Sequence, residues 1–204
     1  MRRPALAMAA MFGAMLFAGS ASAGTVLYDN FDGENGGVGQ LNYYNFANFT
    51  VSNAGSGGAA DLIGNGFFDF YPGNGLYVDV CGSAQQCAVL TTKQSFGPGT
   101  YNVTLDLAGN ARINISDGTT ISFGSYSNTV MLSVNQLEDF HFTETLTSAS
   151  QLSIGDLGIF GPDIGNILLS VEVDQVGVPE PGTLALFGMA LLALGGLSLR
   201  KKST

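Results

Sequence analysis

Apolar and polar side chains alternate along Gly99-Thr-Tyr-Asn-Val-Thr-Leu-Asp-Leu-Ala-Gly-Asn110. Between Tyr101 and Leu107 every second residue is apolar, and the residues between them are Asn, Thr and Asp. Successive side chains of a β-strand point to opposite faces, so this period of two predicts a strand with one buried and one solvated face. The preceding Phe96-Gly97-Pro98-Gly99 predicts a turn.

Similar short segments continue on both sides of this strand, separated by turns rich in Gly, Asn and Asp. They contain no amphipathic helix of useful length, and a parallel sheet would need crossover helices. The sequence therefore predicts an all-β fold, an antiparallel two-sheet sandwich. Asp117-Gly118 is expected to form a two-residue hairpin turn. The expected strands cover residues 25–28, 46–52, 60–63, 67–70, 76–80, 88–95, 101–107, 112–116, 120–123, 129–134, 138–146, 151–154 and 167–173.

Charge is distributed very unevenly. Between residues 24 and 177, Lys93 and Arg112 are the only cations, against fifteen Asp and Glu residues, which gives a net charge of −13. A surface this acidic repels nucleic acid, so nucleic-acid binding is excluded. It suits divalent cations or neutral sugars better than anions.

The first residues have the features of an export signal. Met1-Arg2-Arg3 is a positive segment, residues 5–18 are apolar, and Ala21-Ser22-Ala23 fits the small-x-small cleavage rule. The sequence predicts a signal peptide over 1–23, recognised by the Sec machinery, and a mature chain that begins at Gly24. An uncleaved N-terminal anchor is the alternative.

The last residues combine three parts in a fixed order. A stiff Pro-Glu-Pro at 179–181 precedes an uncharged apolar run over 183–199, and a basic cluster follows at once. At about 1.5 Å per residue the run spans roughly 25 Å, enough for a short transmembrane helix. The basic cluster places the C-terminus on the cytoplasmic side and the domain outside. An ordinary C-terminal anchor is the alternative.

This tail resembles the PEP-CTERM sorting signal of Gram-negative bacteria. The resemblance implies that exosortase, an integral-membrane enzyme with a cysteine nucleophile, cuts near the Pro-Glu-Pro and passes the protein outward. The inner membrane would then hold the chain only transiently, before the cell surface or extracellular matrix. The matching residues are Pro179, Glu180 and Pro181, the apolar residues 183–199, and Arg200, Lys201 and Lys202.

The expected organisation is thus a signal peptide at 1–23, a β-sandwich domain at 24–177 and a sorting signal at 178–204. The segments 63–80, 99–110 and 161–173 resemble the jelly-roll domains of PEP-CTERM proteins, which are similar in topology to galactose-binding-like and carbohydrate-binding modules. The resemblance implies a jelly-roll fold, but a fold does not identify a ligand.

Cys81 and Cys87 are the only cysteines. In an exported protein so close a pair predicts one disulfide that closes a small loop, with two free thiols as the alternative.

Catalysis has little support in the sequence. His141, the only histidine, lies between Phe140 and Phe142 in a strand pattern that predicts a solvated imidazole. A Ser-His-Asp triad would need this residue, and no Gly-x-Ser-x-Gly motif accompanies it. Paired carboxylates for glycoside hydrolysis are available, but nothing distinguishes one pair. The chain is expected not to be an enzyme.

Two binding sites are expected with less support. Asp32 and Glu34 share one acidic turn, and the jelly-roll resemblance implies that Asp163 and Asn166 meet them around a structural Ca²⁺; a solvated acidic turn is the alternative. Separately, Tyr44 and Tyr71 are candidate exposed platforms for sugar rings, with Asp69 and Asn74 beside them. Packing in the core and in turns is the alternative for these four residues.

The sequence thus predicts an exported, exosortase-processed protein of the surface or extracellular matrix, associated with exopolysaccharide or biofilm and without catalytic activity. A carbohydrate-binding module displayed by the same route is the alternative. A secreted hydrolase is the third class.

Overall fold

The computed structural model describes residues 24–53, 60–82, 87–111, 117–157 and 166–177. These residues form twelve β-strands and one short 3-10 helix. The elements are β1 (Gly24–Asp29), η1 (Glu34–Gly37), β2 (Gln40–Tyr43), β3 (Phe49–Asn53), β4 (Ala60–Gly64), β5 (Leu76–Asp79), β6 (Ala88–Thr92), β7 (Gly99–Ala108), β8 (Asp117–Phe123), β9 (Tyr126–Leu132), β10 (Leu137–Leu146), β11 (Leu152–Asp156) and β12 (Ile167–Gln175).

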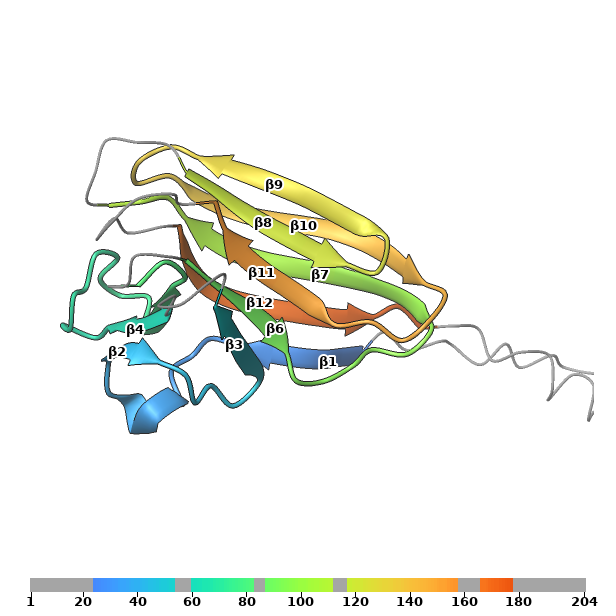
Figure 1. Ribbon diagram of the computed structural model, residues 1–204, viewed down its shortest axis with the longest axis horizontal. Helices are drawn as coiled ribbons and strands as arrows, with labels where there is room; N and C mark the ends of the chain where they lie inside the picture. Colours follow the sequence, from blue (N-terminus) through green and yellow to red (C-terminus); the bar gives the residue numbers. More distant parts are fainter. Residues whose placement is uncertain (1–23, 54–59, 83–86, 112–116, 158–165, 178–204) are drawn as a thin grey trace, which may run out of the picture. The chain divides into compact units, whose positions relative to one another are not determined.

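The strands form two antiparallel sheets packed face to face (Figure 1). One sheet has the order β10-β7-β12-β5-β4-β2, and β1 also pairs with β12. The other sheet has the order β3-β6-β11-β8-β9. The all-β, two-sheet sandwich is therefore confirmed.

The alternation in β7 is confirmed residue by residue. Tyr101, Val103, Leu105 and Leu107 are buried between the sheets, whereas Asn102 is exposed and Asp106 is half-buried on the opposite face. Burying a side chain such as Leu105 contributes about 1.5–3 kcal/mol, so each inward residue of β7 adds to the packing between the sheets.

The outer face of the larger sheet, which points away from the second sheet, carries a second cluster of buried side chains. Tyr77 and Ile63 point outward from β5 and β4 and pack with Tyr71 from the following loop. The Tyr77 hydroxyl accepts hydrogen bonds from the backbone N–H groups of Phe70 and Tyr71 and donates to Asp69. The loop over residues 65–75 is thereby fixed on the outer face, and burial raises the pKa of Tyr77 to about 12.

Three sequence predictions about elements are wrong. The expected strand over 67–70 belongs to this loop, in which Asn65 and Phe68 have positive φ angles that interrupt a strand. Asp117-Gly118 pairs within β8, and the hairpin to β9 turns at Gly124-Ser125, where Gly124 has the positive φ that a two-residue turn favours. Strand β2, which pairs with β4, is not among the expected strands.

Both predicted targeting segments, 1–23 and 178–204, lie outside the described residues, as does the expected strand over 112–116. In the described part of the chain, no helix is long and apolar enough to cross a membrane.

The predicted disulfide between Cys81 and Cys87 is confirmed. It joins the end of β5 to the start of β6, where the backbone N–H of Ala88 also donates to the carbonyl of Val80.

Replacing both Cys81 and Cys87 with Ser should lower the free energy of unfolding by about 2–3 kcal/mol, because so short a loop removes little entropy from the unfolded chain. The double variant should remain folded, since the core between the sheets does not depend on the bond. Urea unfolding of both proteins, with reduced wild type as the control, measures the difference. A double variant that is unfolded in native buffer would contradict the expectation.

Candidate ligand-binding site

A hollow of about 510 Å³ lies on the outer face of the larger sheet. Residues of β1, β7, β10 and β12 line it, together with the turn after β1 and the end of the 65–75 loop. Four of its lining residues are acidic: Asp32, Asp106, Glu138 and Asp139.

The hollow follows from an irregularity in β12. The first two residues of β12 pair with β5, whereas β1 pairs from Val171 onward, so two strands occupy the same edge of β12 with a gap between them. The pairing with β7 also shifts register between Leu168 and Ser170. Such a bulge interrupts the ladder and redirects side chains. Leu169 and Ser170 line the hollow at this position.

Asp32 is held rigidly at one wall. One of its carboxylate oxygens accepts the backbone N–H of Leu76 at 2.9 Å, and the other accepts the side-chain amide of Asn30 at 2.8 Å. Gly75 makes this approach possible, because a Cβ there would collide with the Asp32 carboxylate and the φ of Gly75 is +72°. The sequence Gly73-Asn74-Gly75 is therefore a wall of the hollow rather than a loose turn.

Two further carboxylates are neighbours across the sheet. Asp106 and Asp139 are directly opposite in the pairing of β7 with β10, and Ser170 is opposite Asp106 on β12. The Ser170 hydroxyl donates to the Asp106 carboxylate at 2.5 Å and fixes its orientation. Like charges directly opposite one another destabilise a sheet, so this pair opposes folding.

Apolar surface lies beside these acids. Tyr28 is 57% exposed and Leu137 is 60% exposed, and both line the hollow. An exposed aromatic ring beside hydrogen-bonding groups can stack on the apolar face of a sugar ring while carboxylates and amides bind its hydroxyls.

Of the four residues predicted to bind sugar, only Asn74 lines this hollow; Asp32, predicted as a calcium ligand, lines it too. Tyr44 is 46% exposed but lies outside the hollow lining. Tyr71, expected to be exposed, is buried, and its hydroxyl donates to the carbonyl of Gly109. Asp69 accepts from Tyr77 and from the backbone N–H of Gly66, so it stabilises the loop.

Three of the four predicted calcium ligands, Asp32, Glu34 and Asn166, lie in the described residues, and each has hydrogen-bond partners outside the predicted set. Glu34 is buried and accepts from the backbone N–H of Ala47 at 2.6 Å and from the Tyr43 hydroxyl at 3.2 Å. Burial, and then the Glu34 charge, raises the pKa of Tyr43. Asp32 contacts Leu76 at the first residue of β5, whereas Asn166 precedes Ile167, which pairs with the last residue of β5. Asp163 lies outside the described residues.

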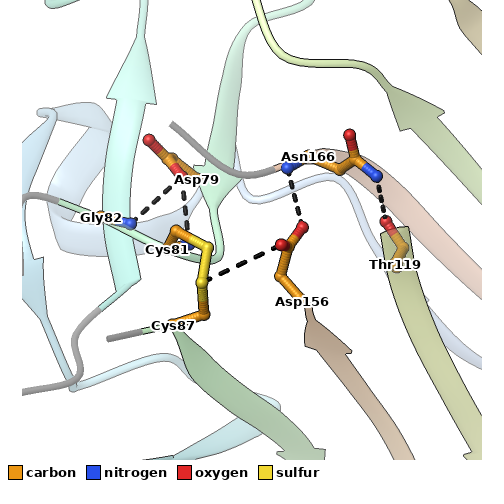
Figure 2. Close-up of a disulfide and its surroundings, with 7 residues drawn as sticks. All are labelled: Asp79, Cys81, Gly82, Cys87, Thr119, Asp156 and Asn166. Atoms are coloured by element: carbon orange, nitrogen blue, oxygen red, sulfur yellow. Dashed lines mark hydrogen bonds between the residues drawn. A yellow bond between two sulfur atoms is a disulfide. The ribbon is translucent and has the colours of Figure 1, made fainter. Parts of the chain in front are cut away.

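Figure 2 shows a second acidic group around the disulfide. The Asp79 carboxylate accepts the backbone N–H groups of Cys81 and Gly82, each at 3.1 Å. The pKa of Asp79 is raised to about 8, mainly by burial. The two hydrogen bonds lower the pKa, and the charges of Asp61 and Asp156 contribute to raising it.

Asp156 connects this group to the start of β12. Its carboxylate accepts the backbone N–H of Asn166 at 2.8 Å, and the Asn166 side chain donates to the Thr119 hydroxyl at 3.0 Å (Figure 2). Asp156 also lies 3.9 Å from the sulfur of Cys87. The two sulfurs are in a disulfide and are therefore not thiolate ligands for a metal.

His141 is exposed on the strand face, as predicted, with 75% of its side chain accessible. Its Nδ1 lies 3.9 Å from the Asp139 carboxylate, which is itself 69% exposed.

A family model described as the PEP-CTERM protein-sorting motif matches residues 177–202. The predicted sorting signal is thus present, and it implies exosortase-dependent export to the cell surface. No curated protein matches the chain.

Among solved structures, the chain is similar to the K3 cleaved adhesin domain of Lys-gingipain from Porphyromonas gingivalis w83, with a TM-score of 0.51 and 17% identity over 76% of this chain and 100% of that one. This likeness concerns the fold alone.

Carbohydrate-active enzymes are also among the similar structures. The exo-β-1,3-galactanase of Phanerochaete chrysosporium has a TM-score of 0.36 and 19% sequence identity over 62% of this chain. The GH26-CBM35 β-(1,4)-mannanase of Podospora anserina has a TM-score of 0.37 and 13% sequence identity over 66% of this chain. The chain spans 29% of the length of each. It spans 14% of a GH115 4-O-methyl-α-glucuronidase. TM-scores this low carry no argument about activity or ligand.

Proposed function

We propose that this chain is an exported, exosortase-processed protein of the cell surface or extracellular matrix whose β-sandwich binds exopolysaccharide without cleaving it. The sorting motif at 177–202 supports the location. The observation that carries the binding function is the hollow on the outer face of the larger sheet, with Tyr28 at its lining.

The size and lining of the hollow suit a glycan. Its volume of about 510 Å³ falls within the roughly 300–1,000 Å³ of small-molecule sites. Tyr28 and Leu137 supply apolar surface, and Asn30, Asn74 and Asp139 supply donors and acceptors for hydroxyl groups. A polymer gains from such a site because many weak contacts along its length add up.

The same residues argue against hydrolysis. A glycosidase acid is kept protonated by apolar surroundings, whereas the Asp139 side chain is 69% exposed and Asp106 accepts a hydrogen bond from Ser170. We therefore assign these carboxylates to binding. Release of reducing ends from exopolysaccharide by the purified protein, lost in Asp106→Asn, would instead support the hydrolase class.

Tyr28→Ala should weaken binding to exopolysaccharide isolated from the producing bacterium by about two- to tenfold, since a stacked aromatic ring contributes about 0.5–1.5 kcal/mol. The matched control is Tyr44→Ala, because Tyr44 is also exposed but lies outside the hollow. Co-sedimentation with the polysaccharide measures both. Equal affinity of wild type and Tyr28→Ala would place the glycan elsewhere, and no binding by wild type would refute the proposed function.

A further inference from the structure

We infer that the hollow selects glycans whose hexosamine units carry free, protonated amino groups. This inference rests on the proposed function and adds the chemical class of the sugar. It follows from the charges that line the hollow and from how the fold holds them.

The hollow has an excess of negative charge that the protein itself leaves unbalanced. Four acidic residues line the hollow, and none of the residues that line it is Lys or Arg. In the part of the chain that the structure describes, Lys93 is the only Lys or Arg, and its ammonium group donates to the carbonyl of Phe46 at 2.6 Å. His141 approaches Asp139 only to 3.9 Å and is highly exposed.

The opposed pair of Asp106 and Asp139 gives the direction of the selectivity. Two carboxylates at directly paired positions repel each other in the free protein. A ligand ammonium group between them neutralises this repulsion and forms charge-assisted hydrogen bonds. A neutral hydroxyl group forms weaker hydrogen bonds and leaves the repulsion in place. An anionic sugar would add to the repulsion.

The acceptors are also oriented before the ligand arrives. Hydrogen bonds from Leu76 and Asn30 hold Asp32, and Ser170 holds Asp106, so these carboxylates lose little freedom on binding. Tyr28 lies at the same hollow, where its ring can stack on the sugar that bears the amino group.

The test uses the full chain in detergent and two probes, the fully deacetylated glucosamine hexamer and its N-acetylated counterpart. Titration calorimetry at mildly acidic pH keeps the amino groups protonated. We expect the deacetylated hexamer to bind at least about tenfold more tightly, because its ammonium groups face carboxylates that otherwise repel one another. Asp106→Asn and Asp139→Asn should each remove most of this preference, because each should weaken binding of the deacetylated hexamer much more than binding of the N-acetylated hexamer.

Two controls separate local selection from other causes. Asp174→Asn changes a carboxylate of β12 outside the hollow and should keep the preference; an equal loss there would assign the effect to the overall net charge and overturn the inference. The melting temperature of Asp106→Asn should be equal to or above that of wild type, because one repulsive charge is gone. A lower melting temperature would attribute lost binding to misfolding and count against the inference.

The outcomes distinguish the inference from the proposed function. Equal affinity for the two hexamers, together with retained binding of exopolysaccharide, would overturn the amino-sugar inference and leave the proposed function in place. Binding that disappears with EDTA would identify a bridging metal ion rather than an ammonium group and would also overturn it. Absence of binding to either hexamer and to exopolysaccharide would refute both.

Discussion

Changing Pro179-Glu180-Pro181 to three alanines is expected to abolish release of the protein and to leave the precursor in the inner membrane. The motif at 177–202 includes these residues, and it implies processing by exosortase. Cell fractionation followed by intact-mass analysis measures the effect. Wild-type protein extracted from the surface should begin at Gly24 and lack most of residues 183–204.

The matched control is Ser203→Ala with Thr204→Ala, at the end of the chain beyond the matched residues. This variant should be processed like wild type. Recovery of the alanine-substituted Pro-Glu-Pro variant at the surface with the wild-type mass would show that exosortase does not depend on this element.

Asp79→Asn is expected to stabilise the domain at neutral and alkaline pH. The side chain is 3% exposed, and burial raises its pKa from 3.8 to about 8. Between these values the unfolded chain has lost the proton that the folded chain keeps, so wild-type stability falls as the pH rises and levels off above the folded pKa. Asn keeps the oxygen that accepts from Cys81 and Gly82 but cannot ionise.

The gain from Asp79→Asn should therefore be absent below about pH 4, increase toward pH 8 and then remain constant. Each unit that separates the folded from the unfolded pKa corresponds to about 1.4 kcal/mol, so the gain is at most about 6 kcal/mol. Urea unfolding at a series of pH values measures it, with Asp174→Asn as a control whose difference from wild type should stay small. A constant difference between Asp79→Asn and wild type across this range would show that Asp79 ionises normally in the folded protein.

The sequence predicts the strands that have one buried face, because alternate side chains of such a strand are buried and therefore apolar. In β7 and β10 the alternation places the inward residues correctly, and the exposure of His141 follows from it. Where a loop buries aromatic residues, the same composition misleads. Tyr71 and Phe70 pack on the outer face through hydrogen bonds to the Tyr77 hydroxyl, a contact without a signal in the local pattern.

The hollow could not be predicted from the sequence, for a related reason. Asp106, Asp139 and Ser170 come from three strands, and only the register of those strands makes them neighbours. Each residue alone is a polar position on a solvated strand face. Asn74 stands in the Gly-rich turn that lines the hollow. Of the predicted calcium ligands, Asp32 contacts the first residue of β5 and Asn166 adjoins the partner of its last residue, a separation that no local pattern in the sequence signals.

The position of β12 also has a mechanical consequence. Its last residue, Gln175, pairs with Gly24 and leads into the C-terminal segment, while Leu169 and Ser170, in its first half, line the hollow. Between these points β12 is bonded on both edges, to β7 and to β1. Inter-strand hydrogen bonds are perpendicular to the strands, so traction between a captured polymer and the C-terminal end loads them together in shear instead of peeling them one at a time. Under the proposed function, we expect this arrangement of β12 to resist a pulling force between the bound glycan and the C-terminal end of the domain.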